Sequence, residues 1–208
     1  SKYPITAICV HDSLRDKFIT FGNGDWSRNE SVLPEELVDK VFYVPCNSER
    51  QILEYFLKYW CDNIPQIVTG WNTQTFDMPY IHNRMVKLGF DVKRLSPWNV
   101  TRLREFPTKQ GTQLRVEIMG VDDIDYLDRY KKNAVQESYR LDHIANIELG
   151  EKKLDYEEAG TLHRLFFADV HKFIAYNFQD TTLVKRIGEK VGLIDVQIAV
   201  AYKAGINY

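Results

Sequence analysis

A strand, a glycine break and a helix follow one another near the centre of the chain, and this order constrains the fold most. Residues 66–69 form a short apolar run that is typical of a buried strand, and Gly70 ends it. Pro79 suits the first turn of a helix, which the pattern extends to about Leu88. Because ligand sites in α/β proteins form where strands end, the loop between Gly70 and Pro79 is a candidate site.

The other periodic segments predict strands early in the chain and helices late. Strand-forming runs come first, at residues 5–10, 17–21 and 41–44, followed by a helix with one apolar face after a cap at Asn47 or Ser48. Segments 101–105 and 113–118 flank a glycine-containing loop that is typical of a β-hairpin, and helical spacing marks residues 141–149 and about 169–191. We therefore expect one mixed α/β domain over residues 1–208, with a hairpin insertion at about 101–120.

The composition is that of a folded protein outside the membrane. Of its 208 residues, 44% are hydrophobic and 27% are charged, which is close to the average for globular domains and excludes disorder. No apolar run reaches 18 residues and the N-terminal segment does not resemble a secretory signal, so we expect a cytoplasmic protein with no membrane partner. We interpret Cys9, Cys46 and Cys61 as reduced thiols, because they form no C-x-x-C pair.

Asp77 is the first candidate for chemistry. It lies in the segment GWNTQTFDMPY (residues 70–80), between the end of a strand and the first turn of a helix. A carboxylate there either faces a ligand at the rim of the sheet or caps the helix that begins at Pro79. The residue types alone leave both interpretations open.

Tyr176 and Asp180 form the second candidate. They stand four residues apart in an expected helix, so a phenol and a carboxylate project from one face toward a common point. The alternative is a core tyrosine with a satisfied hydroxyl group and a solvated aspartate.

The remaining polar clusters predict less. None of the five histidines forms an i,i+4 pair that would bind a metal ion. An acidic cluster at Asp122, Asp123, Asp125 and Asp128 is interpreted as a solvated helix start, because a calcium loop needs a different spacing and a terminal Glu.

The two candidate segments together resemble the motifs of one family. G-W-N-x-x-x-F-D-x-P-Y is similar to the second exonuclease motif of family B DNA polymerases, and Y-x-x-x-D is similar to their third. The resemblance continues through KYPITAICVHDS, RLSPW, IDYLDRYKK and SYRLDHIANIELGEKKLDY, and it is greatest to the replicative polymerases of T4-like bacteriophages. It implies a ribonuclease-H-like, DnaQ-type exonuclease fold and, for a phage protein, the cytoplasm of an infected bacterium.

The chemistry that this resemblance implies is the removal of a mispaired nucleotide from a DNA 3′ end. Two divalent ions, Mg²⁺ or Mn²⁺, assist such a hydrolysis, and they favour hard oxygen ligands. Following the family pattern, Asp180 and Asp77 bind the ions and Tyr176 orients the attacking water. The implied partners are a single-stranded 3′ end or a primer-template, and the remainder of a polymerase.

One part of the family pattern is absent. The family carries a further Asp and Glu, arranged D-x-E, on its first and central strand, and no D-x-E occurs near Ser1. We therefore expect this chain, by itself, to be inactive or nearly so. The absence of a central strand also predicts open sheet edges, with self-association or a distorted sheet as the consequence.

Several side chains are candidates for DNA contacts. Eight basic residues but only two acidic ones lie between Arg84 and Arg115, although the net charge of the chain is −2. The hairpin resembles a strand-separating hairpin of T4-like polymerases, and its basic candidates are Arg102, Arg104, Lys109 and Arg115. The motif that carries Asp77 adds the polar and aromatic candidates Trp71, Asn72 and Phe76. The alternatives are a solvated loop for the basic residues and burial in the core for Trp71 and Phe76.

The sequence leaves three alternative functions open. The first is the proofreading exonuclease domain of a polymerase. The second is a free-standing exonuclease of the same fold, and the third is a DNA-binding module without catalysis.

Overall fold

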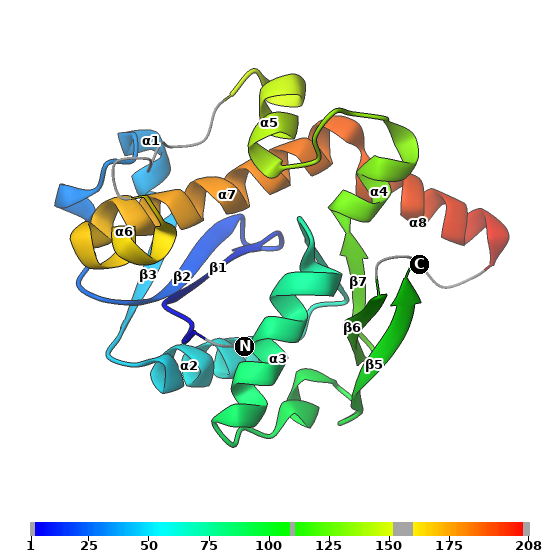
Figure 1. Cartoon of the computed structure of the whole chain (residues 1–208), viewed down its shortest axis with the longest axis horizontal. Coiled ribbons are helices and arrows are strands. Elements are labelled where there is room, and N and C mark those ends of the chain that lie inside the picture. Colours follow the sequence, from blue (N-terminus) through cyan, green and yellow to red (C-terminus); the bar gives the residue numbers. More distant parts are fainter. Residues whose placement is uncertain (1–2, 109–110, 152–159, 206–208) are drawn as a thin grey trace. The chain divides into compact units, whose positions relative to one another are not determined.

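The computed structural model describes residues 3–108, 111–151 and 160–205, which form two compact units (Figure 1). The β1–β3 unit consists of Pro4–Phe56 and Arg140–Arg186. The β4–β7 unit consists of Leu57–Tyr139 together with Ser1–Tyr3 and Ile187–Tyr208. Two helices, α2 (Glu49–Asp62) and α7 (Val170–Val191), contribute residues to both units.

A three-stranded sheet forms the centre of the β1–β3 unit. Its strands are β1 (Ala7–Asp12), β2 (Lys17–Asn23) and β3 (Val41–Cys46), in the order β1-β2-β3. β1 runs antiparallel to β2, with Cys9 opposite Thr20, and β2 runs parallel to β3. The helices of this unit besides α2 and α7 are α1 (Glu35–Val38), α5 (Leu141–Leu149) and α6 (Leu162–Ala168).

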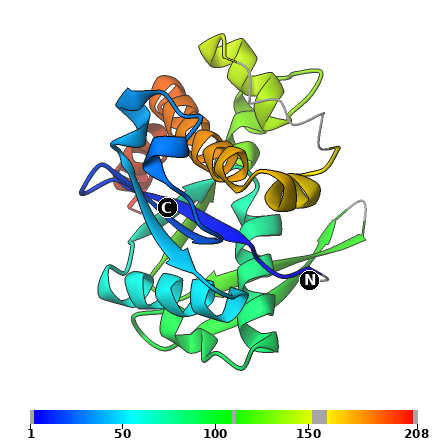
Figure 2. The ribbon, with the colours of Figure 1, turned by 90° about the vertical axis from the view of Figure 1, so that its left-hand side faces the viewer.

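Helices pack on both faces of this sheet, as Figures 1 and 2 show for α7 and α2. Alternate residues of β2 point to opposite faces, so Phe18 meets Phe178 of α7 edge to face at 4.7 Å. Phe21 points the other way and meets Phe56 of α2 at 6.2 Å. β2 is therefore buried on both sides, which explains its almost continuous apolar sequence.

The start of α2 confirms the predicted cap. Ser48 Oγ accepts a hydrogen bond from the N–H of Gln51 at 3.3 Å, and Gln51 Oε1 accepts one from the N–H of Asn47 at 2.7 Å. These reciprocal bonds satisfy the N–H of Gln51 in the first turn of the helix and the N–H of Asn47, which precedes the cap.

The β4–β7 unit contains a parallel strand pair and a hairpin. β4 (Ile67–Gly70) pairs with β7 (Asp122–Asp125), and β5 (Thr101–Thr108) pairs with β6 (Gly111–Ile118). Its helices besides α2 and α7 are α3 (Met78–Lys87), α4 (Tyr126–Asn133) and α8 (Leu193–Ala204), with a 3₁₀ helix, η3, at Val92–Leu95. No helix among the described residues is long and apolar enough to span a membrane.

The mixed α/β class, the hairpin and the long α7 agree with the sequence predictions, and the acidic cluster agrees only in part. A helix does start in this cluster, because Asp125 caps α4 and Asp128 lies in its first turn. Asp122–Asp125 also forms strand β7 and is partly buried, so the interpretation of these residues as solvated is wrong. The sequence predicted neither this strand nor helices α6 and α8. Aspartate disfavours strands by itself, but here β4 pairs with β7 and the neighbouring loop satisfies its carboxylates.

The described strands fall into one sheet of three strands and two of two strands. β1 lies at one end of its sheet and β4 pairs only with β7, so each unit contains a strand with an open edge. The expectation of one domain over residues 1–208 stays a prediction.

Candidate functional site

The loop that carries Asp77 leaves β4 through an unusual backbone path. Asn72 adopts a left-handed conformation (φ 75°, ψ 26°), and a π-helical turn, η2 (Thr73–Asp77), leads directly into α3. Gly70 permits this path because a Cβ atom there would lie 2.3 Å from Cγ2 of Thr73. The sequence predicted the break at Gly70 and the helix at Pro79, but not the π-helical turn between them.

Two aspartates of β7 hold the first half of this loop. Asp125 Oδ1 accepts a hydrogen bond from the N–H of Asn72 at 3.0 Å, and its Oδ2 accepts one from the N–H of Gln74 at 3.3 Å. Thr73 Oγ1 donates to Asp123 Oδ1 at 2.7 Å. Sequence reasoning missed this role of the acidic cluster, although the alternation of Asp123 and Asp125 in a short strand was its signal.

Burial changes the acidity of both carboxyl groups. It raises the pKa of Asp123 to about 6, and the negative charge of Asp125 adds to this effect, while the hydrogen bond from Thr73 opposes it. Burial also raises the pKa of Asp125, although three backbone N–H groups favour its ionised form.

Asp77 is exposed and is the last residue of η2, at the N-cap position directly before α3. Its backbone is already helical (φ −64°, ψ −54°), and its side chain makes no capping hydrogen bond. The alternative in which the Asp77 carboxylate caps α3 is therefore wrong, because the π-helical turn continues directly into the helix. Its neighbour Phe76 is 57% exposed, with its ring 5.7 Å from that of Tyr80.

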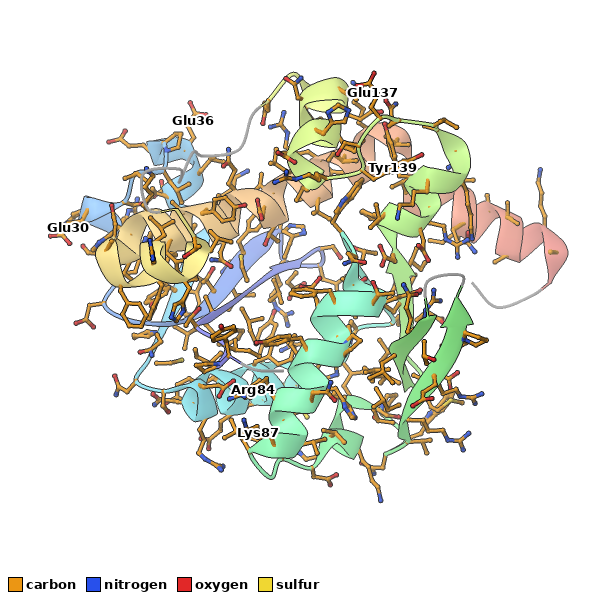
Figure 3. All side chains as sticks on the ribbon, in the orientation of Figure 1. Glu30, Glu36, Arg84, Lys87, Glu137 and Tyr139 are labelled. Carbon is orange, nitrogen blue, oxygen red and sulfur yellow. The ribbon has the colours of Figure 1, made fainter. Side chains whose placement is uncertain are left out.

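Trp71 and Asn72 shape the loop instead of pointing into solvent. Trp71 Nε1 donates to the backbone oxygen of Tyr139 at 2.9 Å, and its ring lies 5.9 Å from that of Tyr130 (Tyr139 is labelled in Figure 3). Asn72 Oδ1 accepts a hydrogen bond from the hydroxyl group of Thr75. These contacts favour the packing alternative for Trp71 and explain Asn72 by local geometry.

Tyr176 and Asp180 lie on α7 in the β1–β3 unit, four residues apart as predicted. Tyr176 is 7% exposed and Asp180 is half-buried. Burial raises the pKa of the Cys9 thiol on β1, and the negative charge of Asp180 adds to this effect. Asp180 therefore belongs to the layer where α7 covers β1. Asp77 belongs to the other unit, so a common site for Asp77 and Asp180 stays a prediction.

The basic residues of the hairpin are partly engaged with carboxylates. Arg104 Nε lies 2.6 Å from Glu117 Oε2, and Arg115 lies 3.6 Å from Asp128 and over the ring of Phe106 at 5.2 Å. Arg102 is exposed, whereas Lys109 lies outside the described residues. Arg84, which begins the basic stretch, is 5% exposed and therefore does not contribute to a basic surface (Figure 3).

The donor atoms for a metal ion are incomplete in the described part of the chain. The Asp77 and Asp180 carboxylates are the hard oxygen ligands that Mg²⁺ and Mn²⁺ favour. No group of three or more His, Cys, Asp or Glu side chains able to hold an ion occurs among the described residues. The residues present therefore fit the type of ligand but not the number that two ions require.

The family comparison agrees with the motifs. Residues 1–144 match the model of the DNA polymerase family B exonuclease domain. The chain is 33% identical to the DNA-directed DNA polymerase of Escherichia phage RB69 and 32% identical to that of Enterobacteria phage T4, in both cases over the whole chain and 25% of the relative. The DNA polymerase catalytic subunit of Psittacid herpesvirus 1 is 29% identical over 74% of the chain and 15% of the relative.

The chain thus spans about a quarter of the length of both phage relatives. Its mixed α/β architecture is consistent with the ribonuclease-H-like fold of this exonuclease domain. The match covers β1 to β7 and the whole Asp77 loop. We conclude that the chain belongs to the family B DNA polymerases, within their exonuclease domain.

Proposed function

We propose that the chain is part of a 3′–5′ proofreading exonuclease, in which Asp77 and Asp180 bind divalent cations and Tyr176 orients the attacking water. One observation carries the proposal. Asp77 is exposed directly before α3, on a loop that is hydrogen-bonded to β7, and its side chain does not cap the helix. An exposed carboxylate after the end of a strand is where α/β proteins bind ligands.

We expect this chain alone to hydrolyse DNA slowly or not at all. Two carboxylates cannot fill the six or more coordination positions of each of two hard cations. The described residues offer no cluster that would complete the set. The chain by itself should therefore bind one ion weakly, and the remaining ligands have to come from elsewhere.

The substrate that we propose is a single-stranded DNA 3′ end. Phe76 is the exposed aromatic residue nearest Asp77 in the sequence, and an exposed ring is suited to stack on an unpaired base. Arg102 is exposed on the hairpin and suits a phosphate contact. Arg104 and Arg115 would first have to leave Glu117 and Asp128, so we expect less from them.

The further partners that we propose follow from the relatives and from the strand edges. The relatives are much longer polymerases, which suggests the remainder of a polymerase as a partner and the cytoplasm of an infected bacterium as the location. Asn23 N–H donates to Thr6 O at 2.9 Å, so the backbone groups of Ala7, Cys9 and His11 point away from β2. An open edge of this kind accepts another strand, and self-association is the simplest source.

A noncatalytic DNA-binding module is the second candidate. The incomplete ligand set among the described residues favours it. This candidate predicts that single-stranded DNA binds equally well with and without divalent cations.

Titration of Mn²⁺ into the purified chain, followed by water-proton relaxation, tests the proposal. We expect weak binding that Asp77→Asn reduces, because the amide cannot replace the anionic ligand. Asp91→Asn is the matched control, since Asp91 is an exposed aspartate that caps η3 in the same unit. Equal Mn²⁺ binding by both variants would contradict the proposed site.

A parallel assay with single-stranded DNA and Mg²⁺ tests the expected weakness of the chain alone. Brisk hydrolysis that Asp180→Asn abolishes would support the nuclease but show that the ligand set is complete. Affinity for DNA that no cation changes, together with no Mn²⁺ binding, would favour the noncatalytic module.

A further inference from the structure

Three successive residues of the Asp77 loop form hydrogen bonds with strand β7. The backbone N–H groups of Asn72 and Gln74 donate to the Asp125 carboxylate, and the Thr73 hydroxyl group donates to Asp123. The side-chain amide of Gln74 also donates to the backbone oxygen of Asp123. Both aspartates lie on one face of β7, because they stand two residues apart in a strand.

The Asp125 carboxylate joins two helix starts. Its Oδ1 accepts a hydrogen bond from the N–H of Leu127 at 2.9 Å, which caps α4, and another from the N–H of Asn72, which precedes η2. Its Oδ2 accepts the N–H of Gln74. Asp125 is only 2% exposed, so water cannot replace these bonds without opening the unit.

The loop needs this support because its own conformation is unfavourable. Asn72 has a positive φ, a backbone conformation that residues other than glycine seldom adopt. The first N–H groups of a helical turn have no partner within the turn, and here Asp125 accepts two of them. Without these bonds, the N–H groups of the half-buried residues Asn72 and Gln74 would lose their acceptors.

The exposed part of the loop follows the hydrogen-bonded segment from Asn72 to Gln74. Thr73 is buried and Gln74 is half-buried, whereas Phe76 and Asp77 are exposed. We infer that Asp125, assisted by Asp123, is a positioning residue that holds the loop from Asn72 to Gln74 and thereby orients Asp77 and Phe76 toward their ligands. This inference rests on the proposed function of Asp77 as a cation ligand.

A simpler role for Asp125 is the cap of α4 alone. Asp125→Ser separates the two roles, because a serine is a good N-cap and keeps the short-range bond to Leu127. The serine side chain is one bond shorter than that of aspartate and has no second oxygen, so it no longer reaches the N–H groups of Asn72 and Gln74. Asp91→Ser is the matched control, because Asp91 caps η3 through the N–H of Lys93 and accepts no bond from the Asp77 loop.

The experiment measures amide hydrogen exchange by NMR and Mn²⁺ affinity for the full chain. In Asp125→Ser we expect amide exchange at Asn72 and Gln74 to accelerate at least about tenfold. A tenfold change corresponds to about 1.4 kcal/mol, which is the contribution of one hydrogen bond. Exchange within α4 should stay as in the wild type. The affinity for Mn²⁺ should fall although Asp77 is intact, whereas Asp91→Ser should change neither quantity.

A second variant covers the case in which Asp125→Ser does not fold. Thr73→Val keeps the shape of the side chain but removes its hydrogen bond to Asp123, and it should accelerate exchange at Asn72 and Gln74 to a smaller degree. Unchanged exchange in both variants, or faster exchange with unchanged Mn²⁺ affinity, would overturn the inference.

The two proposals fail in different ways. If the wild type shows no Mn²⁺ binding that depends on Asp77, the proposed function and the orienting role fail together, but the exchange data still decide whether Asp125 holds the loop. If Asp77→Asn weakens binding and Asp125→Ser does not, the proposed function stands and the positioning role is wrong.

Discussion

Gly22 on β2 and Ile174 on α7 approach so closely that no side chain fits between them. A Cβ atom on Gly22 would lie 3.0 Å from Cδ1 of Ile174 and 2.7 Å from Cε2 of Tyr43. Ile174 is fully buried, and it lies on the helix that carries Tyr176 and Asp180. The absence of a side chain at Gly22 therefore allows α7 to approach the sheet closely at Ile174.

Gly22→Ala should lower the free energy of unfolding by about 1–3 kcal/mol, because an added methyl group overpacks this contact. Urea denaturation measures the change. A second substitution, Ile174→Val, should restore part of the loss, since it removes the atom that lies nearest on α7. Additive effects of the two substitutions would show that Gly22 and Ile174 do not interact as described.

Asp123→Asn should stabilise the chain at neutral pH. The folded pKa of Asp123 is raised to about 6 from 3.8, so its contribution to stability is greatest below about pH 4 and falls as pH rises to about 6. Asparagine removes this cost but still accepts the hydrogen bond from Thr73. We expect a gain on the order of 1–3 kcal/mol at pH 7.5 and none at pH 4.

Chemical denaturation at the two pH values checks this prediction for Asp123. Asp128→Asn is the control, because Asp128 lies nearby and its side chain is 43% exposed. A gain for Asp123→Asn that is the same at both pH values would contradict the electrostatic explanation.

His82 should make the fold less stable in mild acid. It is 8% exposed on α3, and burial lowers its pKa from 6.5. The unfolded chain therefore binds a proton more readily than the folded chain, and stability falls as pH drops below about 6.5. His82→Phe should flatten the pH dependence of the unfolding free energy between pH 7.5 and 5.5, and an unchanged pH dependence in this variant would contradict the prediction.

Phe76 and Trp71 should respond differently to truncation. Phe76→Ala should weaken binding of a short oligothymidylate by about 1–3 kcal/mol and change stability little, because its ring is mostly exposed. Trp71→Ala should lower the unfolding free energy by up to about 3–5 kcal/mol, because it removes packing and the hydrogen bond to Tyr139. Fluorescence anisotropy and urea denaturation measure the two effects, and equal DNA affinity for Phe76→Ala and the wild type would reject base stacking.

The open edge of β1 should make the chain self-associate at high concentration. Sedimentation velocity over a wide range of concentrations should show a rising average mass. Ala7→Pro should reduce this association, because it removes an N–H that points away from β2 while leaving the β1–β2 hydrogen bonds in place. A monomer at every concentration would contradict self-association through this edge.

Much of the architecture was predictable because its signals are local. The Ser48 cap and the apolar face of α2 are properties of neighbouring residues, and so is the hairpin around residues 101–118. Strand β7 was not predictable in this way. Its aspartates become favourable only when the loop after β4 donates hydrogen bonds to them.

The candidate site also has one part that was predictable from the sequence and one part that was not. The two motifs that contain Asp77, Tyr176 and Asp180, together with the further similar segments, indicated the family, and the whole-chain similarity to phage polymerases agrees. The sequence did not show which of these residues are exposed. Phe76 is exposed to solvent, whereas Trp71 donates a hydrogen bond to the backbone of Tyr139. The hairpin residues Arg104 and Arg115 were predicted to contact phosphates. The proximity of Arg104 to Glu117 emerged only from the paired strands, and that of Arg115 to Asp128 only from the position of α4 beside the hairpin.

The sequence by itself determined the longest helices, most strands and the family, because these depend on periodicity, caps and motifs along the chain. Only the tertiary structure decided that Asp77 is exposed and does not cap α3, and that Asp123 and Asp125 hold its loop. The physical reason is that hydrogen bonds between β7 and the loop join residues about fifty positions apart. Such bonds depend on how strands pair and leave no periodic signal in the sequence.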